Sequence, residues 1–100
     1  MVKHIVFWKL EEHAQGRSAA DNAVLVKERL ESLRGEIPGL LHLEVGIDIS
    51  RTDASADIAL YSEFEDMAAL DVYQVHPAHQ AVVGFVGEVR TSRLVVDYEV

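Results

Sequence analysis

The apolar residues of this sequence repeat with two different periods, and the order of the segments restricts the fold. Strand-like patterns, dense in β-branched and aromatic residues or alternating with a period of two, cover residues 2–10, 41–50, 57–64 and 93–99. Spacings of three and four, typical of amphipathic helices, cover residues 18–35 and 66–89. Strand, helix, two strands, helix, strand is the split βαβ order. It predicts an α+β protein with a four-stranded antiparallel sheet and both helices on one face.

Individual residues mark where the helices begin and end. We expect Ser18 to cap the first helix and the Ile37-Pro38-Gly39 segment to break it. Pro77 interrupts the second helical region, because a proline disfavours helical geometry at the preceding His76 and suits the first position of a new helix. The piece that starts at Pro77 is expected to turn Val82, Val83, Val86 and Val89 inward.

Length and composition bound the class of protein. One hundred residues, 49% hydrophobic and 26% charged, predict a single compact domain spanning residues 1–100. The sequence has no cysteine, which excludes disulfides, thiolate metal sites and a cysteine nucleophile. A formal charge of −8 repels phosphate backbones and anionic lipids, so neither nucleic acid nor a membrane is expected as a partner. With no signal-peptide pattern, we expect a cytoplasmic protein.

The strand patterns also predict the two faces of the sheet. The side facing the helices is expected to carry His4, Val6, Trp8, Leu43, Val45, Ile58, Leu60, Leu94 and Val96. The other side is expected to carry Ile5, Phe7, Ala59, Tyr61 and Val95, surrounded by Lys3, Lys9, Asp57, Glu63, Arg93 and Asp97. An apolar centre inside a rim of both charge signs is typical of an interface. We therefore expect a homodimer packed sheet on sheet; the alternative is a monomer with a solvated sheet.

Five short segments are spread along nearly the whole chain. They are Val2-Lys3-His4-Ile5-Val6, Ile37-Pro38-Gly39, Ser62-Glu63-Phe64-Glu65-Asp66, Tyr73-Gln74-Val75-His76-Pro77-Ala78-His79 and Val96-Asp97-Tyr98. In their order and spacing the chain resembles the stress-responsive dimeric A/B barrel (Dabb) family. The resemblance implies a ferredoxin-like protomer whose sheet joins that of a partner to close a barrel.

The resemblance also implies candidate site residues. Relatives of the plant olivetolic acid cyclase type carry out an aldol condensation on a linear polyketide without a cofactor. They use a Tyr and a His of a Tyr-x-x-His-Pro-x-His segment, which correspond to Tyr73 and His79, and a His of the first strand, which corresponds to His4. Those cyclases carry a further His on the third strand, where this chain has Ile58.

The residues themselves suggest a chemistry for this segment. If Pro77 begins a helix, His79 lies in its first turn, where free N–H groups and the helix dipole disfavour an imidazolium. A neutral His79 can act as general base, and Tyr73 can donate a hydrogen bond to an oxygen that gains negative charge. His4 would orient a substrate or hold His79 in one tautomer. The alternative is that these residues only pack or cap.

Two classes of function follow. In the first, the protein is a binding or stress-protective module that holds a small, partly apolar molecule between sheet and helices. The residues expected around this molecule are His4, Val6, Trp8, Ile58 and His76. In the second, the protein is a cofactor-independent cyclase or lyase of the polyketide aldol type, with His79 as base and Tyr73 as hydrogen-bond donor. A cofactor-free oxygenase is a third activity compatible with the architecture.

No cofactor and no metal is expected; two possible metal sites are the alternatives. His4, His76 and His79 could form a three-histidine site. Backbone carbonyls near Arg34, Ile37 and Leu40 could hold a hard cation such as Mg²⁺. Capping by His76, and water or later N–H groups on the carbonyls, are the expected alternatives.

Overall fold

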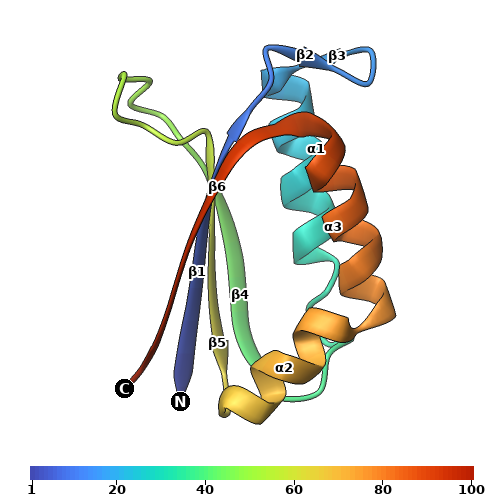
Figure 1. Ribbon diagram of the computed structural model, residues 1–100, viewed down its shortest axis with the longest axis vertical. Coiled ribbons are helices and arrows are strands. Elements are labelled where there is room, and N and C mark those ends of the chain that lie inside the picture. Colours follow the sequence, from blue (N-terminus) through green and yellow to red (C-terminus); the bar gives the residue numbers. More distant parts are fainter.

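The computed structural model describes residues 1–100 and contains one four-stranded antiparallel sheet. The strand order is β4-β5-β1-β6, with β1 at Val2–Leu10, β4 at Leu40–Ile47, β5 at Ile58–Phe64 and β6 at Arg90–Glu99. A small hairpin, β2 (His13–Ala14) and β3 (Arg17–Ser18), follows β1 and was not predicted from the sequence. All helices lie on one side of the sheet (Figure 1), which confirms the α+β ferredoxin-like fold.

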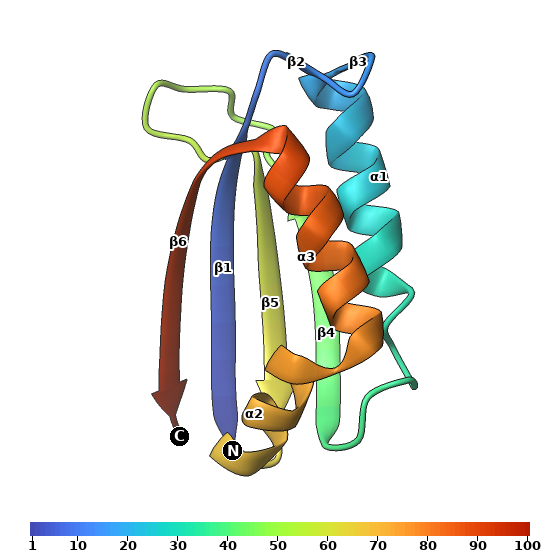
Figure 2. The ribbon, with the colours of Figure 1, turned by 45° about the vertical axis from the view of Figure 1, so that its right-hand side comes forward.

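Three helices cover that side of the sheet (Figure 2): α1 (Ala19–Glu31), α2 (Met67–Val75) and α3 (Pro77–Val89). The Ser18 hydroxyl accepts a hydrogen bond from the backbone N–H of Asp21 at 3.2 Å, so the expected cap is confirmed. Between α2 and α3, His76 has extended backbone angles, as expected for a residue before proline. The chain therefore turns between two helices at His76–Pro77 instead of continuing as one.

The hydrophobic core lies between the sheet and the helices. β1 and β5 turn alternate residues inward, and α1 contributes Val26 and Leu30, both almost fully buried. On α3 the buried residues are His79, Val82, Phe85, Val86 and Val89. Val83 is 45% exposed and lines the cavity described below, so the expectation that it belongs to the buried stripe is wrong. Phe85 is buried instead. The buried stripe of α3 includes Val82 and Val86 and extends from them toward Phe85, away from Val83.

The faces of β6 differ from those expected. Residues that oppose each other across an antiparallel pair point to the same face. Val95 pairs with Val6, whereas Leu94 pairs with Phe7 and Val96 with Ile5. Val95, with Arg93 and Asp97, therefore lies on the helix side, and the predicted positions of these residues, of Leu94 and of Val96 were wrong. Both alternating sets of β6 contain apolar residues, so periodicity alone does not choose between them.

The side of the sheet without helices, called the open face below, has an apolar centre. Its apolar residues are Ile5, Phe7, Ala59, Tyr61, Leu94, Val96 and Tyr98. Phe7, Leu94, Val96 and Tyr98 are between 41% and 72% exposed. Charged groups lie beside them: the Tyr61 hydroxyl donates to Glu63 at 2.5 Å, and the Lys3 ammonium lies 5.7 Å from the Tyr61 ring centre.

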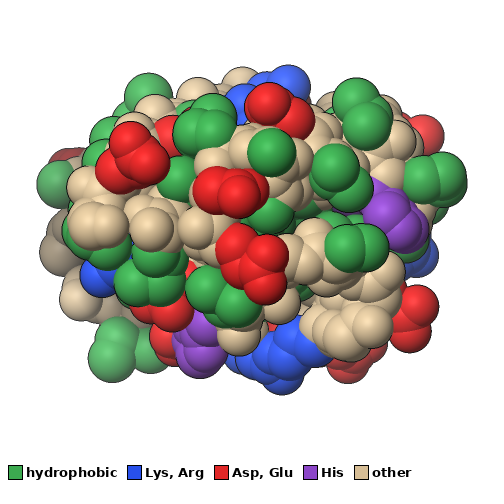
Figure 3. Space-filling view, turned by 90° about the horizontal axis from the view of Figure 1, so that it is seen from below, with side chains coloured by type: hydrophobic (Ala, Val, Ile, Leu, Met, Phe, Trp, Pro, Cys, Tyr) green, Lys and Arg blue, Asp and Glu red, His purple; other side chains and the backbone are tan.

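Acidic side chains are dispersed over the surface. Figure 3, which looks at the end of the molecule that carries α2 and both termini, shows them scattered among hydrophobic groups instead of gathered in one patch. None of the helices has the length and apolar character needed to cross a bilayer.

Candidate functional site

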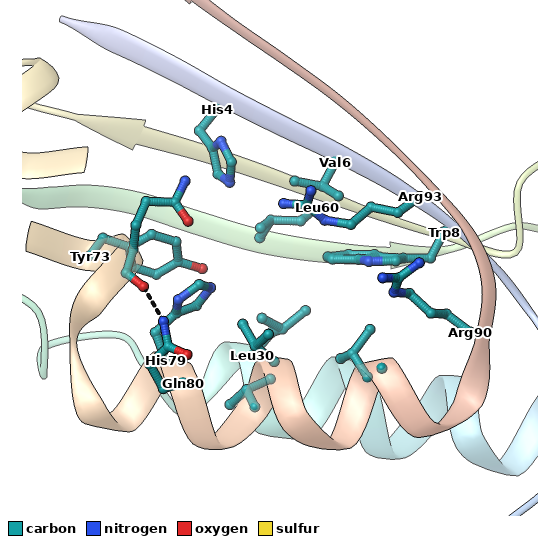
Figure 4. Close-up of a pocket in the computed structure, with 15 residues that line it drawn as sticks. His4, Val6, Trp8, Leu30, Leu60, Tyr73, His79, Gln80, Arg90 and Arg93 are labelled. Atoms are coloured by element: carbon teal, nitrogen blue, oxygen red, sulfur yellow. Dashed lines mark hydrogen bonds between the residues drawn. The ribbon is translucent and has the colours of Figure 1, made fainter. Parts of the chain in front are cut away.

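A cavity of about 300 Å³ lies between the helix side of the sheet and α3 (Figure 4). It is lined by His4, Val6, Trp8, Leu30, Leu60, Tyr73, Gln74, His79, Gln80, Val82, Val83, Val86, Gly87, Arg90 and Arg93. Its size is at the lower end of the roughly 300–1,000 Å³ found for small-molecule sites. The lining combines a mostly aliphatic middle with polar groups at both ends, which is the usual composition of such sites.

Tyr73 and His79 reach one end of the cavity from the two sides of the His76–Pro77 break. Tyr73 is in the last turns of α2, and His79 is in the first turn of α3. The His76 Nδ1 accepts a hydrogen bond from the Ala78 N–H at 3.1 Å and so caps α3. This arrangement brings the Tyr73 and His79 rings together, with their centres 4.0 Å apart and a 36° angle between their planes.

Two buried polar atoms at this end have no partner in the protein. They are the hydroxyl oxygen of Tyr73 and Nδ1 of His79. The Tyr73 side chain is fully buried and His79 is 8% exposed. Leaving such a group unpaired costs about 1–3 kcal/mol, so buried polar groups are normally satisfied. Both groups belong to residues that line the cavity, where a polar group of a bound molecule could pair with them.

His4 reaches the same end of the cavity from β1. Its Nδ1 lies 2.5 Å from Oδ1 of Asp97, which is the residue opposite it on β6. A carboxylate on Nδ1 orients the ring and leaves Nε2 for a ligand. His4 and Tyr73 are in edge-to-face contact, with ring centres 6.0 Å apart. His4 is thus hydrogen-bonded to Asp97, and the expectation that His4 holds His79 in one tautomer has no hydrogen bond to support it.

Burial sets the protonation of the two groups. It lowers the pKa of His79 below its ordinary value of 6.5; the Gln74 carbonyl opposes this shift, and the charges of His4 and Arg93 add to it. Burial also raises the pKa of Tyr73 above its ordinary value of 10.0. At neutral pH, His79 is therefore a neutral imidazole with an acceptor nitrogen, and Tyr73 is a hydrogen-bond donor.

A titration of stability tests the protonation of His79. Above pH 6.5, His79 is neutral in both the folded and the unfolded chain, so it adds no pH dependence. Below that pH, the unfolded chain takes up a proton that folded His79 resists, and the free energy of unfolding falls. Between about pH 7.5 and about pH 5.5, the wild type should lose about 1 kcal/mol more than His79→Gln. Urea unfolding at the two pH values measures this; equal losses would contradict it.

The structure brings together five of the residues expected from the sequence. His4, Val6, Trp8, Tyr73 and His79 all line the cavity. Two others lie elsewhere. His76 caps α3, and Ile58 is buried in the core beside a shallow hollow near Gly46 and Ala56.

Four polar lining residues were not expected from the sequence: Gln74, Gln80, Arg90 and Arg93. The Gln80 amide donates to the Gln74 carbonyl at 2.5 Å, the bond dashed in Figure 4. No pattern in the sequence marks Arg93, because its place at the cavity follows from the β1–β6 register, which sets it opposite Trp8.

The two metal alternatives have little support in this geometry. The described residues contain no cluster of three or more His, Asp or Glu side chains, so His4, His76 and His79 do not converge. At the end of the first helical region, the Ile37 carbonyl accepts a hydrogen bond from the Leu40 N–H at 3.3 Å.

Comparison with known proteins identifies the family. Residues 2–100 match the family described as the stress responsive A/B barrel domain. An uncharacterized protein of Streptomyces coelicolor is 35% identical over 100 residues, covering 99% of this chain and 99% of that protein.

Solved structures show the same similarity. A dimeric, ferredoxin-like protein of unknown function from Bacteroides fragilis is 34% identical, with a TM-score of 0.82, covering 99% of this chain and 95% of that one. Another from Jannaschia sp. CCS1, also described as dimeric, is 33% identical, with a TM-score of 0.78, covering 99% and 98%. The chain described here belongs to the stress responsive A/B barrel domain family.

Proposed function

We propose that this protein binds a small, partly apolar molecule in the cavity between its sheet and α3. The observation that carries the proposal is the pair of buried, unpartnered groups, the Tyr73 hydroxyl and His79 Nδ1, at one end of the cavity. A hydroxyl or carbonyl group of a ligand would satisfy both. The aliphatic middle, formed by Val6, Leu60 and Val86, would contact its apolar body.

The protein is further proposed to act as a homodimer that packs through its open face. Its relatives from Bacteroides fragilis and Jannaschia sp. CCS1 are described as dimeric. Ile5, Phe7 and Tyr61 belong to this face as expected, and Leu94 and Val96 replace Val95 in it. The cavity is on the other side of the sheet, so the dimer would leave it within each protomer.

A second candidate function is a cofactor-independent cyclase or lyase. It is favoured by a neutral His79, a protonated Tyr73 and a His4 held by Asp97, all around one cavity. His79 would take a proton from a carbon beside a carbonyl, and Tyr73 would donate to the oxygen that becomes the enolate. The third-strand position of the cyclases is Ile58 here, which is buried in the core away from this cavity.

Tyr73→Phe distinguishes a binding role of the hydroxyl from a structural one. Because the variant removes a buried group without a partner, we expect the free energy of unfolding to stay level or rise by up to about 1 kcal/mol. We expect the affinity for a neutral probe, 4-hydroxyacetophenone, to fall about fivefold, because the variant cannot make the hydrogen bond that the Tyr73 hydroxyl would donate. Urea unfolding and an NMR titration measure the two effects.

Tyr98→Phe is the matched control, since Tyr98 lies on the open face, and it should leave binding unchanged. A Tyr73→Phe protein that is less stable but binds equally well would make the hydroxyl structural and contradict the proposal. The same probe separates the enzyme candidate: exchange of its methyl hydrogens in D₂O that stops in His79→Gln would show proton abstraction. Binding without hydrogen exchange would indicate a binding protein that does not abstract a proton from this probe.

A further inference from the structure

Two arginines line the part of the cavity away from Tyr73 and His79. Arg90 caps the C-terminus of α3 where the chain enters β6, and Arg93 lies opposite Trp8 in the sheet. Figure 4 shows Arg90 beside Trp8 at one end of the cavity, Tyr73 and His79 at the other, and the Arg93 side chain reaching the middle beside Leu60. The cavity is thus cationic from its Trp8 end to its middle, and it carries the uncharged polar groups of Tyr73 and His79 at the other end.

These two arginines differ from the other four of the chain. Arg17 and Arg29 lie over the ring of Phe85, and Arg17 also donates to Asn22. Arg34 pairs with Glu31, and Arg51 lies 4.0 Å from Asp57. Arg90 and Arg93 make no ion pair, side-chain hydrogen bond or cation–π contact. Both side chains are exposed to solvent, and no acidic residue of the protein pairs with them although the chain carries seventeen.

The cavity lining contains no acidic side chain that could neutralise them. Asp97, the nearest acid along β6 on this side of the sheet, is bonded to His4. The charge of Arg93 also reaches the far end of the cavity, where it lowers the pKa of both Tyr73 and His79, although burial dominates both shifts. The cavity is therefore locally positive although the protein as a whole is negative.

We propose that the ligand is a small organic carboxylate, held at its acid group by Arg93 and Arg90. Guanidinium groups bind carboxylates by paired, charge-assisted hydrogen bonds. The apolar body would lie against Trp8, Val6 and Val86, and a hydroxyl or carbonyl at the other end would meet Tyr73 and His79. This inference rests on the proposed binding function and specifies the chemical class of its ligand.

Two probes of equal shape test the charge. 4-Hydroxyphenylacetate carries the carboxylate, and 4-hydroxyphenylacetamide is its neutral counterpart. By NMR titration, we expect the wild type to bind 4-hydroxyphenylacetate about tenfold more tightly than the amide. A hydrogen bond to a charged group contributes about this much to affinity. Arg93→Gln should remove this preference, because it weakens binding of the carboxylate and leaves binding of the amide unchanged. Arg90→Gln should reduce the preference by a smaller factor. Arg51→Gln, which changes an exposed arginine outside the cavity, should leave it intact.

The outcomes separate this inference from the function on which it rests. If both probes bind equally well to the wild type, or Arg93→Gln keeps the preference, the carboxylate inference is wrong and the binding function stands. If neither probe binds, the binding function fails and the inference fails with it. Loss of the preference in Arg93→Gln, with amide binding retained, supports both.

Discussion

Gly39→Ala is expected to lower the free energy of unfolding by about 3 kcal/mol, the largest effect of an alanine at any glycine of this chain. Gly39 has a φ of +79°, where an L-residue is strained by about 1–2 kcal/mol. An added Cβ would also lie 2.5 Å from the Cβ of Ala69 on α2. Forcing the two apart costs about 1–3 kcal/mol in a packed region.

Gly35→Ala is the matched control. Gly35 has almost the same φ, +80°, but an added Cβ meets nothing within 4 Å. Gly35→Ala should therefore lower the free energy of unfolding by the backbone strain alone, about 1–2 kcal/mol. Urea unfolding of the two variants isolates the contact with α2, the helix that carries Tyr73 to the cavity. Equal losses would show that the approach of Gly39 to Ala69 does not matter for stability.

The second large effect concerns assembly. Phe7 lies near the centre of the open face, between Ala59 and Leu94 on the neighbouring strands, and is 41% exposed. In the proposed dimer, Phe7→Asp would bury an unpaired carboxylate, which costs about 3–5 kcal/mol. The dimer Kd should rise at least about a hundredfold, giving monomers at micromolar concentration in sedimentation velocity.

Val75→Asp serves as the control for a charge placed on an exposed valine. Val75 is 73% exposed at the end of α2, on the helix side of the molecule. This variant should remain a dimer. If the wild type is itself a monomer, or if Phe7→Asp leaves the dimer intact, the open face is not the interface. Circular dichroism of Phe7→Asp checks that the fold is retained.

The sequence by itself determined the four long strands, the helical regions and most of the inward-facing residues, but not the β2–β3 hairpin. Hydrophobic periodicity is a local property, so the strands, the two helical regions and the buried side of β1 could be read from neighbouring residues. Local chemistry also marked the Ser18 cap and the break at Pro77, both present in the structure. From this break came the expectation that Tyr73 and His79 approach one another with His4, as they do around the cavity.

Only the tertiary structure decided what the last strand contributes. Both alternating sets of β6 carry apolar residues, and pairing with a strand about ninety residues earlier selects which set faces the helices. That register, a long-range property, places Asp97 on His4 and Arg93 at the cavity, and moves Leu94 and Val96 to the open face. A shift of one residue would exchange the two sets. The charged end of the site therefore depends on strand pairing, which no local pattern in the sequence specifies.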